Sequence, residues 1–286
     1  MSLKEVKQRI ASVKNTQKIT SAMKLISAAK LRRAQNAIEG MLPYRKKLDE
    51  MLLSLLSSVN DFSTPFTRRS DVKNVAIVTI SSNTSLCGGF NAAVIKETKA
   101  VIDEYSAQGA KVEIFPSGKK VADALVKAGL QVNVALMSQS AQAIYSDISA
   151  SAYEFMRRFV AGELDCIELI YTHFHSAAKQ IVTREKLLPF DFSTFERTKT
   201  ANIQDYIIEP TKERLLEQLI PKVITMRLFT SFLDSAAAEH AARMLAMQIA
   251  TDNADDLITT LVREYNKSRQ QAITNELLDI VAGSMN

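Results

Sequence analysis

Two short segments contain residue types that could bind phosphate. The first is Ser85–Asn91, with the sequence SLCGGFN, which follows an apolar stretch at Val75–Ile80 and precedes a segment predicted to be helical. Glycine-rich turns of this kind can cradle phosphate, because backbone N–H groups at the helix start point at the anion. The second is Gly118-Lys119-Lys120, a fragment of the GxxxxGK[ST] motif without its upstream glycine. Neither has the full spacing of a nucleotide-binding motif, so a tight strand-to-helix turn is the stronger interpretation.

Candidate metal and nucleophile residues are few. His173 and His175 would point to the same side of a strand and could share a metal, but no third ligand of suitable type is near them in the sequence. Cys87 and Cys166 have no CxxC partner, and no serine lies in a GxSxG motif. The sequence therefore predicts no catalytic residue, no cofactor site and no metal site.

Composition restricts the class of protein. A chain of 286 residues with 47% hydrophobic residues can bury a core, and only 8 glycines and 6 prolines favour long helices over turn-rich β folds. The net charge of +5 fits an acidic protein partner, a nucleic acid or an anionic membrane surface about equally well. The charged N-terminal segment does not resemble a signal peptide, and no apolar run reaches the ~20 residues of a membrane span. We expect a protein on the cytosolic side.

The elements that would position these residues begin with two break-free segments. Neither glycine nor proline occurs in residues 1–39, which end before Gly40 and Pro43, or in residues 222–282, which lie between Pro221 and Gly283. As one helix the second segment would be roughly 90 Å long, far longer than an ordinary helix. This length favours a protruding rod over two amphipathic helices of a bundle, which periodicity alone allows equally well.

Both segments have the spacing of an antiparallel coiled coil. In the C-terminal segment, seam positions alternate in steps of three and four along Met244, Met247, Thr251, Ala254, Ile258, Leu261, Tyr265, Ser268 and Ala272. In the N-terminal segment the same rhythm runs through Leu3, Val6, Ile10 and Val13 and resumes at Ile19, Met23 and Ile26. The phase changes between Val13 and Ile19, which predicts an irregular supercoil there.

The middle of the chain alternates between strand and helix signals. Strands are predicted at 75–80, 111–115, 131–136, 166–172 and, at an edge, 180–187, with helices at 91–108, 119–128 and 140–161. Such alternation predicts a mostly parallel, Rossmann-like α/β sheet. The resulting fold class is α/β plus a long antiparallel coiled coil. The predicted segments are an N-terminal helix at 1–60, a central α/β domain at 70–210 and a C-terminal helix at 211–286.

The N-terminal helix is strongly basic, with a cluster at Lys30-Leu31-Arg32-Arg33. Its charges are distributed all round the helix, and no aromatic residue alternates with them. This pattern argues against a basic stripe that binds nucleic acid. A basic rod inside an acidic protein sleeve would have the same composition. The two alternatives, along with a nucleotide-dependent α/β enzyme, stay open on residue patterns alone.

Several longer strings resemble one protein family, the gamma subunits of bacterial F-type ATP synthases. The matching strings are NTQKIT at 15–20, AMK at 22–24, AAKLRRAQ at 28–35, LCGGFN at 86–91, EHAARM at 239–244, ATDNA at 250–254, YNKSRQ at 265–270 and ITNEL at 273–277. They cover both ends and the middle of the chain in the family's order. One departure is Asn83-Thr84-Ser85, where the family usually has Asp-Arg-Gly. This replacement removes both charges and any ion pair that the loop would make.

The resemblance implies a rotating shaft without an active site or cofactor. Its end helices would lie inside a ring of alpha and beta subunits, and its central domain would bind the epsilon subunit and the membrane c-subunit ring. It would couple proton flow to ATP synthesis at the beta subunits, on the cytoplasmic side of the bacterial cell membrane, and would bind no nucleic acid. The implied contacts are Arg269, Gln270 and Thr274 with upper beta-subunit loops, Met23 and Arg243 near the beta-subunit lever, and Tyr206 and Glu209 with the c ring.

Overall fold

The computed structural model describes residues 3–59, 62–67, 71–135, 144–191 and 208–284. They belong to two compact units. One unit combines Met1–Ala28 with Arg243–Asn286, and the other is Ala29–Ala242. The expected segments at 1–60, 70–210 and 211–286 stay a prediction, as does the protrusion of a rod. No described helix is both long and apolar enough to cross a membrane.

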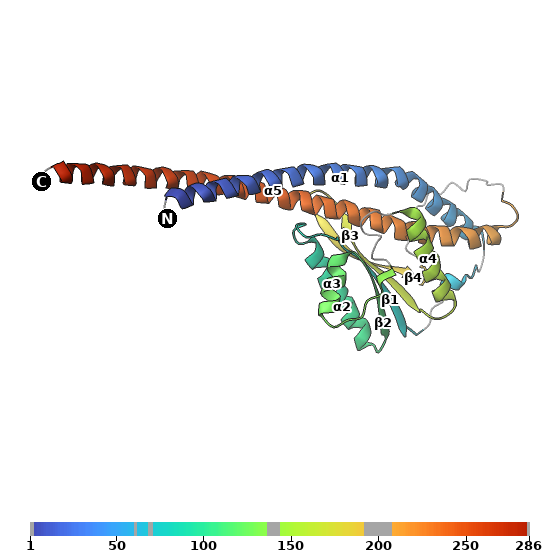
Figure 1. Ribbon diagram of the computed structural model, residues 1–286. Helices are drawn as coiled ribbons and strands as arrows, with labels where there is room; N and C mark the ends of the chain where they lie inside the picture. Colours follow the sequence, from blue (N-terminus) through green and yellow to red (C-terminus); the bar gives the residue numbers. More distant parts are fainter. Residues whose placement is uncertain (1–2, 60–61, 68–70, 136–143, 192–207, 285–286) are drawn as a thin grey trace. The chain divides into compact units, whose positions relative to one another are not determined.

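Two long helices supply residues to both units. Helix α1 spans Leu3–Ser57 and helix α5 spans Lys212–Ser284 (Figure 1). Both are longer than the break-free segments, because Pro43 and Pro221 lie inside them. A proline inside a helix removes a backbone hydrogen bond at a cost of about 3 kcal/mol. Burial of apolar side chains around Pro221, where Ile220 and Ile224 are fully buried, offsets that cost, so α5 continues past the proline.

A four-stranded sheet forms the centre of the larger unit. The strands are β1 (Asn74–Ile80), β2 (Lys111–Ser117), β3 (Cys166–Phe174) and β4 (Gln180–Leu188), in the spatial order β2-β1-β3-β4. Strand β1 is parallel to both β2 and β3, whereas β4 is an antiparallel edge strand. The predicted mostly parallel α/β sheet and its edge strand are confirmed.

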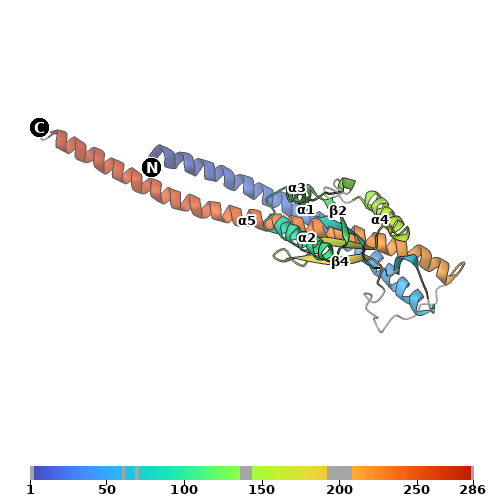
Figure 2. The ribbon, with the colours of Figure 1, turned by 90° about the horizontal axis from the view of Figure 1, so that it is seen from below.

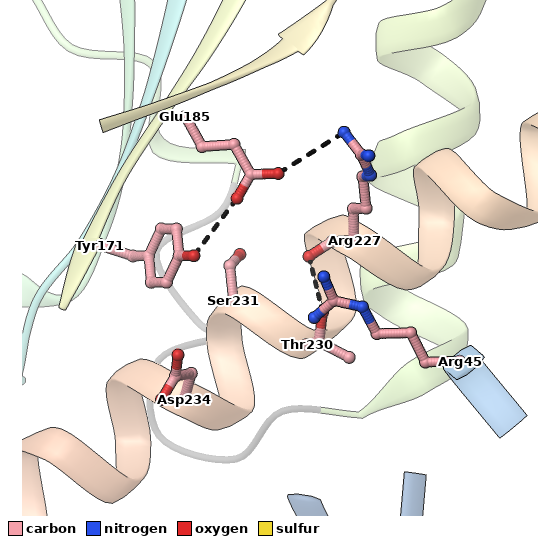
Figure 3. A pocket seen from close by; sticks show the side chains of 7 residues that line it. All are labelled: Arg45, Tyr171, Glu185, Arg227, Thr230, Ser231 and Asp234. Carbon is pink, nitrogen blue, oxygen red and sulfur yellow. Dashed lines mark hydrogen bonds and ion pairs between the residues drawn. The ribbon is translucent and has the colours of Figure 1, made fainter. Parts of the chain in front are cut away.

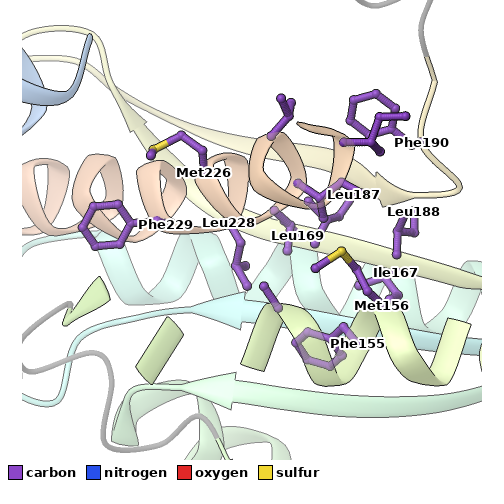
Figure 4. Close-up of a cluster of buried hydrophobic side chains, with 14 of the residues drawn as sticks. Phe155, Met156, Ile167, Leu169, Leu187, Leu188, Phe190, Met226, Leu228 and Phe229 are labelled. Atoms are coloured by element: carbon purple, nitrogen blue, oxygen red, sulfur yellow. The ribbon is translucent and has the colours of Figure 1, made fainter. Parts of the chain in front are cut away.

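Helices cover both faces of this sheet, so its strands are apolar on both sides. One face packs against α2 (Phe90–Ala107) and α3 (Lys119–Lys127) through residues such as Val75 and Ile77. The opposite face packs against α4 (Tyr145–Val160), α5 and the second half of α1 through residues such as Val78 and Leu169. Figure 4 shows Leu169 and Leu187 in one cluster with Phe155 of α4 and Leu228 of α5. Alternate residues of one strand therefore belong to two separate cores. A short 3-10 helix at Pro65–Thr67 follows α1.

The third strand predicted at 131–136 is wrong. Residues 131–133 have no regular structure, 134–135 form a helical turn, and Leu136 lies outside the described residues. One backbone bond, from Asn133 N–H to the Ile114 carbonyl at 2.8 Å, links this segment to β2. The side chain of Asn133 then bonds Glu113 and the Ala135 N–H, which turns the chain away from the sheet. The helix predicted from residue 140 begins at Tyr145, and residues 140–143 lie outside the description.

Candidate functional site

The carboxyl ends of β1 and β2 lie where a phosphate would bind in this kind of sheet. Here the chain itself satisfies the first amides of α3. Lys119 N–H donates to Asn83 Oδ1 at 3.0 Å, Lys120 N–H to the Ser82 carbonyl at 3.2 Å, and Val121 N–H to Ser81 Oγ at 3.2 Å. A side chain at Gly118 would collide with Ser81, because its Cβ would lie 2.3 Å from the Ser81 carbonyl oxygen. The Gly118-Lys-Lys segment is therefore a close-packed turn with no donor of these three left for an anion.

The Ser85–Asn91 loop is closed in a similar way. Asn91 accepts the Ser82 N–H at 3.1 Å and donates from Nδ2 to Ser82 Oγ at 2.8 Å and to Cys87 Sγ at 3.1 Å. Cys87 is buried against Ala238 and Ala242 of α5. This loop therefore fixes the carboxyl end of β1 to α5. Asn83, the first residue of the unusual Asn-Thr-Ser triplet, belongs to the same loop and accepts the Lys119 N–H at the start of α3, whose N-cap residue is Gly118.

The two histidines do not form a metal site. His173 Nδ1 lies 2.6 Å from Asp234 Oδ2, and the other oxygen of Asp234 accepts the Phe174 N–H at 2.8 Å. His175 lies beyond the last residue of β3, so the two rings are not on one strand face as expected. Among the described residues no cluster of three or more metal-ligating side chains occurs. Asp234 instead connects the end of β3 to α5.

A polar cluster between α1, α5, β3 and β4 was not predicted from the sequence. The side chains in Figure 3 line this cluster. They enclose a cavity of about 20 Å³, which is room for about one water. Tyr171 OH donates to Glu185 Oε2 at 3.2 Å, and Arg227 lies 3.7 Å from Glu185 Oε1. Burial lowers the pKa of Arg227 and raises the pKa of Asp49 beside it. With opposite charges already paired, this cluster fixes helices to the sheet and offers no free acid or base.

A second buried ionic group lies on the other face of the sheet. Glu168 of β3 is 3% exposed, and it accepts bonds from Tyr105 OH at 2.6 Å and from Arg184 Nη2 at 3.1 Å. Arg184 also bonds Glu104 on α2, and this bond holds the pKa of Glu104 below its usual value. A glutamate inside the apolar run CIELIY was the available signal for a paired buried charge, because an unpaired one would be costly.

The terminal helices pair in an antiparallel arrangement within the smaller unit. Thr20 Oγ1 and Thr251 Oγ1 lie 2.8 Å apart, and Gln17 Nε2 donates to Asp255 Oδ1 at 3.0 Å. In Figures 1 and 2 the N-terminal part of α1 lies beside the C-terminal half of α5. The nine seam positions predicted along α5, from Met244 to Ala272, are all buried or half-buried. The predicted seam of α5 and the antiparallel coiled coil are confirmed.

The predicted N-terminal seam is wrong after Val13. Ile19 is 60% exposed and Ile26 is 57% exposed, so neither faces α5. The rhythm of threes and fours instead continues without a phase change through Gln17, Thr20 and buried Ser27. Polar residues occupy these positions because Gln17 and Thr20 form hydrogen bonds across the pair. Ile19 and Ile26 form an outward-facing apolar stripe, seven residues apart on one helix face.

The expected contact residues have different environments. Met23 is half-buried at the margin of the seam, and its carbonyl accepts the Ser27 hydroxyl at 2.7 Å. Arg243 is 9% exposed. The residues expected near the end of α5 are exposed, namely Arg269, Gln270 and Thr274. Beyond Ala272 the apolar side chains Ile273, Leu277, Leu278, Ile280 and Val281 are also exposed. The end of α5 therefore presents a row of side chains that the described chain does not cover.

The structure describes one of the two residues expected at the c ring. Glu209 is exposed just before α5, and Tyr206 lies outside the described residues. Their contact role stays a prediction.

Comparison with known proteins gives matches along the whole chain. The family model described as ATP synthase matches residues 2–285. The ATP synthase gamma chain of Phocaeicola vulgatus is 50% identical over 286 residues, which is 99% of each chain. That of Flavobacterium psychrophilum is 45% identical over 284 residues, or 99% of this chain and 98% of the relative.

Solved structures show the same fold. A chain in the Euglena gracilis mitochondrial ATP synthase (OSCP/F1/c-ring, rotational state 3) superposes with a TM-score of 0.66 at 19% identity. The match covers 99% of this chain and 93% of that one. A chain of the Tetrahymena thermophila mitochondrial ATP synthase central stalk and c ring has a TM-score of 0.57 at 23% identity. It covers 81% of this chain and 99% of that one.

Proposed function

Because the chain belongs to the family of ATP synthase gamma chains, we propose that it is the central rotor shaft of a bacterial ATP synthase. The catalytic nucleotide sites lie on the beta subunits. The observation that carries this proposal is the antiparallel pairing of the two chain ends, joined at Thr20 and Thr251. A helix pair with contact residues on its outer surface suits a shaft, and the closed amides at the start of α3 leave no phosphate cradle there.

The helix pair is electrostatically asymmetric. Within residues 3–28 of α1 the cations are Lys4, Lys7, Arg9, Lys14, Lys18 and Lys24, against the single anion Glu5. Within residues 243–281 of α5 the anions are Asp252, Asp255, Asp256, Glu264, Glu276 and Asp279, against Arg243, Arg263, Lys267 and Arg269. The pair therefore presents a basic helix on one side and an acidic helix on the other, so in every orientation the surrounding beta subunits meet different charges. Differential contact of this kind can favour different beta-subunit states in turn, whereas equal contact with all states would shift nothing.

The contact residues divide the shaft into levels. Arg269, Gln270 and Thr274, which are exposed, contact upper loops of the beta subunits. The exposed apolar end of α5 turns within an apolar collar of the ring, because such side chains are stabilised by leaving water.

The lower levels of the shaft use other contacts. Met23 and Arg243 act near the beta-subunit lever. The outward position of Ile19 and Ile26 supports this role, since it places an apolar stripe beside Met23. Tyr206 and Glu209 contact the c ring, and the central domain also binds the epsilon subunit.

These roles make the chain a non-catalytic, peripheral subunit on the cytoplasmic side of the bacterial cell membrane. Proton flow turns the c ring and the attached shaft. The shaft then changes the beta subunits in sequence. The chain transmits work and regulates activity, and it supplies no group to the reacting phosphates.

The proposal is tested by separating hydrolysis from coupling. The pure chain should neither bind nor hydrolyse ATP appreciably, and membrane vesicles with the whole complex should pump protons only when the chain is present. A truncation after Gln271 serves as a graded variant, because it removes the apolar end and keeps the rest of the seam. It should weaken assembly and ATPase activity without abolishing them. Stoichiometric ATP turnover by the pure chain would overturn the proposal.

A further inference from the structure

Two hydrogen bonds cross the paired helices at one level of the seam. Thr20 Oγ1 and Thr251 Oγ1 lie 2.8 Å apart, and one turn away Gln17 Nε2 donates to Asp255 Oδ1 at 3.0 Å. Thr20 and Thr251 are half-buried at seam positions, where apolar side chains usually pack. A polar side chain at such a position lowers the stability of a helix pair, and in coiled coils it specifies how the helices align. Alignment of α1 with α5 is therefore the property that these residues serve.

The two threonine hydroxyls do not need each other as hydrogen-bond partners. Thr20 Oγ1 also lies 3.0 Å from the Gln17 carbonyl oxygen, and Thr251 Oγ1 lies 2.8 Å from the Met247 carbonyl oxygen. Each hydroxyl has one proton, so two protons serve three contacts, and one threonine donates across the pair. If the pair were displaced, each hydroxyl would still have an acceptor on its own helix. The bond across the pair thus fixes a relative position and satisfies no otherwise orphaned group.

Hydrogen bonds and apolar contacts resist sliding to different degrees. A hydrogen bond weakens steeply once its atoms separate or lose alignment, whereas apolar burial has no preferred direction. The seam neighbours of Thr251 on α5 are Met247 and Ala254, both buried. A flexible methionine and a small alanine adapt to a displaced partner more easily than a branched side chain does. At this level of the pair, the polar contacts therefore give the steepest resistance to sliding.

Sliding is the motion that torque imposes on a rod of two helices. Torque winds or unwinds the supercoil, and this moves facing residues past one another along the helix axes. We propose that Gln17, Thr20, Thr251 and Asp255 form a polar pin that makes α1 and α5 turn together under load; this inference rests on the proposed function. Without the pin the pair yields by sliding, so ATP hydrolysis continues while fewer protons are pumped for each ATP.

Thr251→Val tests the pin, because valine keeps the branched shape of threonine and lacks the hydroxyl. In membrane vesicles with the complete ATP synthase, this variant should pump fewer protons per ATP hydrolysed at an unchanged ATPase rate. Thr251→Ser keeps the hydroxyl and should pump like the wild type. Thr260→Val is the matched control, because Thr260 is exposed on the same helix and its hydroxyl donates to the Asp256 carbonyl at 3.0 Å. It should leave both activities unchanged.

The second bond of the pin allows a test by exchange of groups. Gln17→Glu places a carboxylate opposite that of Asp255, which replaces an attraction by a repulsion. This variant should also lose pumping relative to hydrolysis. Adding Asp255→Asn to it restores an amide–carboxylate pair with the donor on the other helix, and pumping should recover. Failure of the double variant to recover would contradict the pin.

Amide hydrogen exchange of the free full-length chain separates the pin from a purely structural role. Residues 247–255 of Thr251→Val should exchange at an unchanged or lower rate, because an apolar side chain in the seam stabilises the pair. Faster exchange together with lost pumping would mean that the hydroxyl serves the fold, which contradicts the inference. Unchanged pumping per ATP in Thr251→Val, or equal losses in pumping and hydrolysis, would overturn it. Wild-type vesicles that pump equally well without this chain would overturn the proposed function itself, so the two failures are distinguishable.

Discussion

Leu261 and Leu257 allow a matched test of the helix pair. They lie one turn apart on α5, but Leu261 is 2% exposed in the seam and Leu257 is 39% exposed outside it. The register set by Thr20 and Thr251 brings Leu261 level with Ile10 of α1, which is half-buried. Replacing either leucine by alanine changes helix propensity equally, so any difference between the two variants reports packing.

The expected difference is large because the pair buries few bulky side chains. Among the described residues of this unit, the buried apolar positions are Val6, Met247, Ala254 and Leu261. A buried leucine replaced by alanine costs about 2–4 kcal/mol, whereas Leu257→Ala removes a side chain that is already two-fifths exposed and should cost about 1 kcal/mol or less. At 1.4 kcal/mol per factor of ten, local opening should increase roughly 30-fold or more for Leu261→Ala and about fivefold or less for Leu257→Ala.

Native-state amide hydrogen exchange of residues 254–268 measures this opening directly. The reasoning predicts faster exchange over this segment in Leu261→Ala, with Leu257→Ala close to the wild type. Equal acceleration in both variants, or a larger effect at Leu257, would show that the seam does not follow the threes-and-fours pattern.

Three other changes test separate parts of the account. Met23→Lys should preserve ATP hydrolysis and reduce proton pumping in membrane vesicles. The reason is that an added charge near an acidic group of the beta subunit would favour one rotary position. Equal losses in both activities would mean that Met23 serves only in packing. Gly118→Ala should lower the free energy of unfolding by about 2 kcal/mol or more, since its Cβ meets the Ser81 carbonyl, whereas Gly40→Ala, in open space inside α1, should raise it by about 0.5–1 kcal/mol. Glu104→Gln should cause a small decrease in melting temperature at pH values above 4.5, and this decrease should disappear in more acidic solution. The reason is that Arg184 lowers the pKa of Glu104, and this interaction stabilises the fold only while the carboxylate is charged. A difference that grows as the pH falls below 4.5, or that grows with added salt, would contradict that sign.

The sequence was most informative where one physical requirement decided the pattern. Strand β1 was predictable because burial on both faces demands a continuous apolar run. The α5 seam was predictable because every third or fourth residue must face α1, even where that residue is Thr251 or Ser268. In both cases a local pattern sufficed, and no knowledge of the partner element was needed.

Errors arose where polar partners or outside surfaces decided the structure. Ile19 and Ile26 have seam-like spacing but face outward, while Gln17 and Thr20 occupy the seam through bonds to α5 residues that the sequence could not place. The pairing of Glu168 with Arg184 depends on the register of β3 and β4. That register follows from packing between distant segments, and a single sequence does not contain it.

The contact residues were beyond prediction from local pattern for a different reason. Arg269, Gln270 and Thr274 are exposed on a helix surface, where a binding residue and an ordinary solvated one have the same neighbours within the chain. Their identification came from resemblance to the family. Only a complex with the ring can assign their partners.

Rotation of this chain inside the ring tests the central claim most directly. Cys87 and Cys166 are buried, so a cysteine introduced by Val126→Cys, at a 57% exposed position of α3, offers a selective attachment point for a probe. With the alpha–beta ring immobilised and ATP supplied, the account predicts continuous rotation of the probe in one direction. A ring that hydrolyses ATP at full rate while the probe stays still would contradict the proposal that this chain is the rotor shaft.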